Sequence, residues 1–116
     1  MSERVAICVC TYHQTELLRI CLESLAAQRA PDGVEFWIVV VDAEAEMSAR
    51  PIVNAFRNAC QFPVVYVHQP QLGSEAARSA ALDAAVLHAC DWVAFVGDHE
   101  AVAPEGIAQL MRQRGA

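Results

Sequence analysis

Hydrophobic residues gather in four short runs that alternate with longer amphipathic segments. The runs are rich in Val, Ile and Cys and carry few charges; they cover residues 4–10, 35–42, 63–68 and 91–96. Short, continuous apolar runs of this kind are typical of strands that are buried on both faces of a parallel sheet. The pattern therefore predicts four buried strands.

The segments between and after these runs show apolar residues at helical spacing. We expect helices over residues 16–28, 49–60, 75–90 and 104–114. Side chains suited to an N-cap precede the first three of them, namely Thr15, Ser48 and Ser74. Pro104 suits the first position of the last helix, and the turn sequence at 30–33 ends the first helix.

Strands that alternate with helices indicate an α/β fold, a parallel sheet of about four strands with helices on both faces. The 116 residues suffice for one domain, 1–116, and are too few for two. In such sheets ligands bind beyond the carboxyl ends of the strands, where the strand order reverses. Polar or small residues near these ends are the candidate site residues: Thr11, Tyr12, His13, Asp42, Glu44, Gly73, Arg78, Asp98, His99 and Glu100.

The charge pattern narrows the partners. The chain has a formal net charge of -6, and its basic residues are all Arg, scattered along the sequence. An acidic surface without a basic stripe argues against nucleic acid or an anionic membrane as partner. The first residues do not resemble a signal peptide, and no apolar run approaches the length of a transmembrane helix, so we expect a cytoplasmic protein without a transmembrane segment.

Five cysteines, an odd number without a CxxC spacing, are expected to be buried and reduced rather than paired in disulfides. Cys8 and Cys10 share one face of a predicted strand, so a zinc site formed by these two cysteines and a histidine is an alternative. The spacing of paired zinc ligands that would support it is absent from the sequence. Neither the dinucleotide-binding glycine motif nor the P-loop motif occurs.

Four segments carry a family resemblance in their order and spacing. They are VAICVCTYHQTELLRICLESLAAQ, FWIVVVD, GSEAARSAALDAA and DWVAFVGDHEAVAPEGI. Together they resemble the N-terminal, nucleotide-binding half of the family 2 glycosyltransferases, which have the GT-A fold. The resemblance implies a nucleotide-diphosphate sugar as ligand, a UDP-sugar foremost.

The resemblance also implies roles for individual residues. Thr11 and Tyr12 match the loop beside the base, Asp42 the carboxylate that binds the base, Arg78 a helical arginine near the nucleotide, and Asp98 the acid near the ribose. His99 stands where the family has an Asp that ligates Mg²⁺ or Mn²⁺. The residues by themselves leave two alternatives open. One is that Arg78 forms an ion pair with Glu75 or Asp83, and the other is that His99 is an exposed residue of the loop.

Departures from the family pattern weaken the expected chemistry. Gly97 and His99 replace carboxylates, which removes hard oxygen ligands from the expected metal site. The family's acceptor site and catalytic base belong to a following segment, so no catalytic residue is assigned. We expect a glycosyltransferase-like domain that is incomplete as a transferase by itself. The alternative is a non-catalytic dimeric or partner-binding protein, with a homodimer formed through the exposed edge of the sheet.

Overall fold

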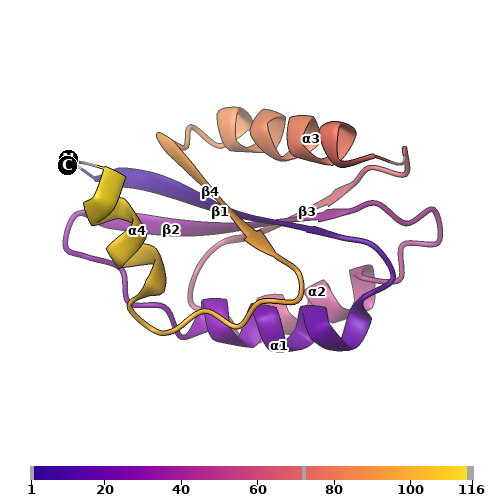
Figure 1. Ribbon diagram of the computed structural model, residues 1–116, viewed down its shortest axis with the longest axis horizontal. Helices are drawn as coiled ribbons and strands as arrows, with labels where there is room; N and C mark the ends of the chain where they lie inside the picture. Colours follow the sequence, from indigo (N-terminus) through magenta and orange to yellow (C-terminus); the bar gives the residue numbers. More distant parts are fainter. Residues whose placement is uncertain (1, 72, 115–116) are drawn as a thin grey trace.

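A parallel four-stranded sheet forms the centre of the protein (Figure 1). The computed structural model describes residues 2–71 and 73–114. The strands lie in the order β3-β2-β1-β4. Their bounds are Glu3–Thr11 for β1, Val34–Asp42 for β2, Val64–His68 for β3 and Trp92–Gly97 for β4. All four predicted strands are confirmed, each end lying within one residue of its predicted position. Their predicted burial holds for β1 and β2 only, because β3 and β4 are the edges of the sheet and are partly exposed.

Helices cover both faces of this sheet, as Figure 1 shows. On one face lie α1 (Thr15–Ala26), α2 (Arg50–Ala59) and α4 (Gly106–Arg114); α3 (Ser74–Leu87) covers the other. The predicted α/β fold with helices on both faces is thus confirmed.

Alternating residues of the central strands supply two separate cores, because successive side chains point to opposite faces of a sheet. One core joins Val5, Ile7 and Val9 of β1 to buried residues of α1, α2 and α4. The other joins Ala6 and Cys8 to α3, which contributes only small side chains: Ala77, Ala81, Ala84 and Ala85. The alanines let α3 lie close to the sheet.

The strand register brings the ends of the strands together. Thr11 pairs with Asp42, and Asp42 with His68, while Gly97 of β4 pairs with Cys10. The chain runs from β1 outward to β3 and then returns to place β4 on the other side of β1. The strand order therefore reverses between β1 and β4, which is where a ligand site is expected.

The predicted N-caps are each wrong by one residue. Thr15 and Ser74 are already the first helical residues, and Gln14 and Gly73 precede them without a side-chain cap. Ala49 is the N-cap of α2; the Ser48 hydroxyl instead donates a hydrogen bond to the Glu44 carboxylate. In each case the short polar side chain that was predicted as the N-cap does not cap the helix.

Two helix boundaries also differ from prediction. Helix α3 ends at Leu87, not at Cys90, because Ala89 adopts a left-handed conformation with φ 56°. The Cys90 N–H then donates to the Ala85 carbonyl at 2.9 Å, the arrangement of a Schellman motif. Pro104 lies in a turn ahead of α4, which begins at Gly106.

Strand β4 forms one edge of the sheet, as the sequence suggested. Phe95 on this strand is 38% exposed, and Val86 and Leu87 of α3 are 77% and 80% exposed. In the described part of the chain, no helix has the length and apolar character needed to cross a membrane.

Candidate functional site

A cavity of about 370 Å³ opens at the carboxyl edge of the sheet, beside the point where the strand order reverses. Its walls come from the end of β1 and the loop after it, the loop after β2, the start of α3 and the residue after β4. They are Cys10, Thr11, Tyr12, Gln14, Ala43, Gly73, Ser74, Ala77 and Asp98. Three of the predicted nucleotide-binding residues, Thr11, Tyr12 and Asp98, are thus brought to one cavity.

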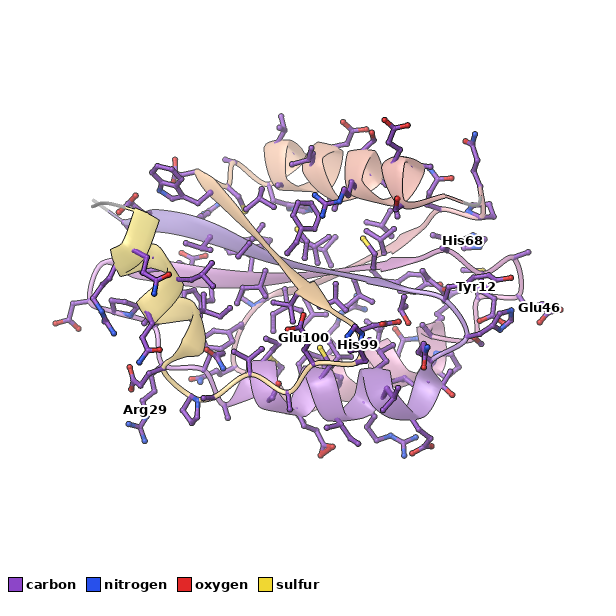
Figure 2. The ribbon with its side chains drawn as sticks, viewed as in Figure 1. Tyr12, Arg29, Glu46, His68, His99 and Glu100 are labelled. Carbon is purple, nitrogen blue, oxygen red and sulfur yellow. The ribbon has the colours of Figure 1, made fainter. Side chains whose placement is uncertain are left out.

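Two neighbouring hollows share walls with this cavity. One, of about 250 Å³, shares Tyr12 and Ala43 and extends over the loop after β2 to Glu46 and Pro70. The other, of about 340 Å³, shares Cys10, Ser74 and Asp98 and extends to Arg78 and Phe95. We call the three together the edge groove. Figure 2 shows Tyr12 and Glu46 at one end of the sheet, with His99 and Glu100 on the loop after β4.

Arg78 lies at the end of the edge groove on α3. Its guanidinium carbon is 4.6 Å from the centre of the Phe95 ring, a cation–π contact. Neither of the predicted alternatives, an ion pair with Glu75 or with Asp83, is present among the described residues. The arginine therefore keeps its donors free to face an anion in the groove.

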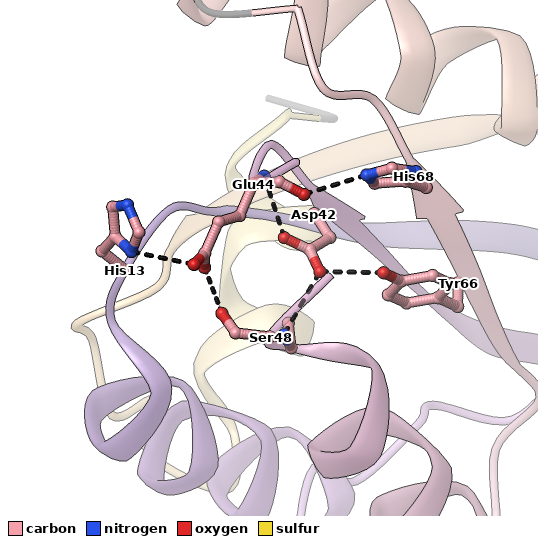
Figure 3. Close-up of polar contacts among 7 residues, drawn as sticks. His13, Asp42, Glu44, Ser48, Tyr66 and His68 are labelled. Carbon is pink, nitrogen blue, oxygen red and sulfur yellow. Dashed lines mark hydrogen bonds and ion pairs between the residues drawn. The ribbon is translucent and has the colours of Figure 1, made fainter. Parts of the chain in front are cut away.

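Asp42 is placed differently from the other predicted residues, because its carboxylate is 1% exposed and is not among the groups lining the edge groove. One oxygen accepts the Glu44 N–H at 3.0 Å; the other accepts the Ala49 N–H at 3.2 Å and the Tyr66 hydroxyl at 2.8 Å (Figure 3). Burial and the neighbouring Asp42 carboxylate raise the pKa of Tyr66 above its ordinary range, so the hydroxyl stays a donor.

Glu44 forms a second layer of this network, nearer the groove. Its buried carboxylate accepts the Ser48 hydroxyl and lies 3.0 Å from His13 Nδ1, and its carbonyl oxygen lies 2.9 Å from His68 Nε2 (Figure 3). His13, which has a left-handed backbone with φ 54°, therefore links the loop after β1 to the loop after β2. The contacts fix the two loops that form the walls on the Tyr12 side.

The loop after β4 folds back as a tight turn. The Glu100 carboxylate accepts the Gly97 N–H at 2.6 Å, and the Glu100 N–H donates to the Gly97 carbonyl at 3.0 Å. Asp98 stays largely buried at the groove, 3.6 Å from His99 Nδ1, whereas His99 is exposed. We call Gly97–Glu100 the tip.

The tip is a poor fit for a divalent cation. Asp98 offers a hard oxygen ligand, but Glu100 is engaged with the backbone and His99 is a soft substitute for a carboxylate. In residues 2–71 and 73–114, no group of three or more His, Cys, Asp or Glu side chains is placed to hold a metal ion. The same finding gives no support to a zinc site built on Cys8 and Cys10.

The five cysteines are free thiols, and burial is the main cause of their raised pKa values. Cys8 is buried with its pKa raised to about 12, and desolvation also raises the pKa of Cys10, although the nearby Arg78 charge lowers it in part. Cys10 lines the edge groove as a protonated, weakly nucleophilic side chain. It contributes surface rather than reactivity.

Several residues at or behind the site were not predicted as such. Tyr66 anchors Asp42, and Gln28 is a buried polar residue that binds the segment after β4. Tyr66 leaves a faint signal, a polar group within an apolar strand run. Gln28 leaves none, because its hydrogen-bond partners, apart from the Ser24 carbonyl, lie more than seventy residues away in the sequence.

Fold and groove together define an α/β domain with a candidate ligand groove at the switch point of a parallel sheet. The chain belongs to glycosyl transferase family 2, whose family model matches residues 6–113. The predicted family and its GT-A-like fold are therefore confirmed.

A curated relative is the succinoglycan biosynthesis protein ExoM of Rhizobium meliloti (strain 1021). It is 36% identical over 107 residues, which are 92% of this chain and 33% of that protein.

Solved structures show the same fold. The mannosyltransferase PcManGT from Pyrobaculum calidifontis, in complex with GDP-Man and Mn²⁺, matches with a TM-score of 0.77 at 22% identity over 97% of this chain and 32% of its own. Residues 1–349 of S. aureus TarS, in complex with UDP-GlcNAc, match with a TM-score of 0.70 at 26% identity over 94% and 30%. The chain thus spans about a third of the length of these relatives.

Proposed function

We propose that the edge groove binds a nucleotide-diphosphate sugar, a UDP-sugar foremost, and that the chain supplies the donor-binding part of a family 2 glycosyltransferase. The observation that carries the proposal is the convergence of Tyr12, Asp98 and Arg78 on one groove at the switch point. Related proteins have been solved with UDP-GlcNAc and with GDP-Man, which supports this class of ligand.

Each groove residue suits one part of such a ligand. The ring of Tyr12, which is 46% exposed, offers a stacking surface for the base, beside Thr11. Asp98 offers acceptors to ribose hydroxyls, and Arg78 offers a planar set of donors to the diphosphate. Asp42 supports the loop on the Tyr12 side of the groove. Its carboxylate would bind a base only if it gave up one of its present hydrogen bonds.

The groove holds the donor mainly through these side chains, with a weak contribution from Mn²⁺ or Mg²⁺. A divalent cation would neutralise the diphosphate, and Asp98, with His99 beside it, is the group at the tip that would face it. Because the set of metal ligands at the tip is incomplete, we expect nucleotide-sugar binding to depend at most weakly on a divalent metal.

Glycosyl transfer also needs a general base that deprotonates the acceptor hydroxyl, and we assign that role to none of the described side chains. We propose that hexosyl transfer requires residues beyond those that correspond to this third of the relatives.

Thermal denaturation with UDP, GDP, dTDP and UDP-glucose, each with and without Mn²⁺, tests the proposal. A ligand at 100 times its Kd stabilises the folded state by about 2.7 kcal/mol, which raises Tm by several degrees. We expect a rise with UDP and UDP-glucose that is lost in Asp98→Asn and Arg78→Ala. Arg19→Ala, an exposed arginine on α1, is the matched control and keeps the rise. No rise with any nucleotide at millimolar concentration contradicts donor binding.

A second candidate is a non-catalytic protein that associates with itself or a partner through its apolar edge. The observation in its favour is the exposed apolar surface beside β4, formed by Leu82, Val86 and Leu87 of α3 and by Phe95 of β4, which Arg78 of α3 contacts. We propose that this surface and the β4 edge form a homodimer interface, whether or not the groove binds a nucleotide.

A further inference from the structure

The segment between β4 and α4, residues 98–105, runs alongside α1 and is held by it (Figure 1). We call this segment the strap; its first three residues belong to the tip. Side chains of α1 and of the residues after it contact the strap and its two ends in sequence order. The contacting residues are Cys21, Ser24, Gln28 and Arg29.

Gln28 is the central anchor of the strap. It is 2% exposed, and its amide nitrogen donates to the carbonyl oxygens of Val102 at 3.2 Å and Ala103 at 2.7 Å. Its amide oxygen accepts the Ile107 N–H at 3.1 Å. One buried side chain thus binds both the strap and the first turn of α4, and it gives the buried N–H of Ile107 its acceptor.

The other contacts hold the two ends of the strap. Ser24 Oγ accepts the Val102 N–H at 3.0 Å, and Cys21 Sγ lies 3.6 Å from the Gly97 carbonyl oxygen. At the far end, the Arg29 N–H donates to the Pro104 carbonyl at 2.9 Å. Helix α1 and the two residues Gln28 and Arg29 that follow it therefore hold the strap from the last residue of β4 to the turn before α4.

We propose that Gln28 is a positioning residue that fixes the strap and, through it, the place of Asp98 in the edge groove. The strap continues directly from the tip, whose turn is closed by two hydrogen bonds between Gly97 and Glu100. Gly97 is also held by its pairing with Cys10 of β1, so loosening the strap shifts the Asp98 side of the groove, which Gly97 and Glu100 also line, and leaves the Tyr12 side in place. The role assigned to Asp98 toward a ligand rests on the proposed function.

Gln28→Met tests this because it keeps the length of the side chain and removes its polar atoms. Ser24→Ala is a milder second variant, which removes the acceptor of the Val102 N–H. The control is Val53→Ala, a truncation at a fully buried residue of α2 that destabilises the fold and removes no hydrogen bond of the strap. The temperature of measurement is set equally far below the Tm of each variant.

Two readouts are taken. Amide chemical shifts and hydrogen exchange of residues 97–107 report the tip without any ligand. The Kd values of UDP and of uracil report the groove, because uracil lacks the ribose that Asp98 is proposed to bind. We expect both strap variants to change the amide signals of Gly97 and Asp98, and Gln28→Met to weaken UDP about tenfold while uracil changes less than about twofold.

The positioning role is contradicted if the tip signals stay unchanged in Gln28→Met, or if Val53→Ala changes them equally. It is also contradicted if UDP and uracil weaken in parallel. Failure of the wild-type chain to bind UDP would contradict the proposed function, and the ligand-free tip signals would still decide whether Gln28 positions Asp98.

Discussion

The carboxylate of Asp42 shows how one residue at a strand end can serve the fold before it serves a ligand. It joins β2, the loop after β2, the N-terminus of α2 and β3 through three donors, and it is 1% exposed. A buried charge with this many donors is costly to leave incomplete. Substituting it therefore alters the fold as well as any base contact.

We expect Asp42→Asn to lower the free energy of unfolding by about 2–3 kcal/mol, because an amide cannot accept from all three donors and loses the charge-assisted bonds. Tyr66→Phe, which removes one donor and leaves the carboxylate in place, should cost about 1–2 kcal/mol. Urea denaturation of the wild type and both variants measures this. Equal stability of Asp42→Asn and wild type would show that the network is not structural. Asp98→Asn is accordingly the cleaner probe of ligand binding.

At the scale of elements, the end of α3 depends on a residue in an unfavourable conformation. Ala89 closes the helix with φ 56°, where an L-residue with a Cβ is strained and glycine is not. We expect Ala89→Gly to raise the free energy of unfolding by about 0.5–1 kcal/mol. Ala80→Gly, the same change inside α3, should instead lower it by about 1 kcal/mol. Chemical denaturation of the two variants gives the signs, and a loss of stability in both would contradict the strain.

The tip offers a gain-of-function prediction. In Gly97→Asp/His99→Asp, the added Cβ at position 97 meets the ends of the Glu100 and His99 side chains, which are flexible, and one of these is removed. The variant adds hard oxygen ligands beside Asp98. We expect Mn²⁺ to raise the Tm of its UDP complex by a few degrees more than for the wild type.

The matched control for the tip is Gly97→Asn/His99→Asn, which has side chains of the same size without charge. If Mn²⁺ raises the Tm of both double variants equally, added carboxylates do not create a metal site at this tip.

Local patterns predicted the elements well and their ends less well. Runs of apolar residues identified each strand, most clearly the central strands β1 and β2, where burial on both faces leaves few polar positions. The N-caps were misplaced because a short polar side chain near a helix start need not cap it: Ser48 is drawn to Glu44. The end of α3 was missed because its left-handed residue is Ala89, without the glycine that signals such an end.

Part of the site was also predictable from the sequence. The switch-point rule brought Tyr12, Asp98 and Arg78 to one edge from sequence order alone. It gave no information on burial, which turned Asp42 toward the interior. Gln28 was outside reach, because its hydrogen bonds join segments whose proximity only the folded chain establishes.

For the molecule as a whole, the open question is what covers the edge of the sheet. The chain carries a net charge of -6, which favours solubility, yet β4 and the outer face of α3 expose apolar side chains side by side. An edge strand also presents unpaired backbone groups that favour pairing with another strand. A symmetric dimer hides both at once.

We expect the wild-type chain at micromolar concentration to have twice the mass of the 12.6 kDa chain by light scattering after gel filtration. Val86→Glu, at a residue that is 77% exposed, places a charge in the proposed interface and should give the monomer mass without loss of fold. Ile20→Glu on α1, at a residue that is 53% exposed, is the matched control and should leave the dimer intact. A monomeric wild type would contradict the homodimer, and a dimer that survives Val86→Glu would place its interface elsewhere.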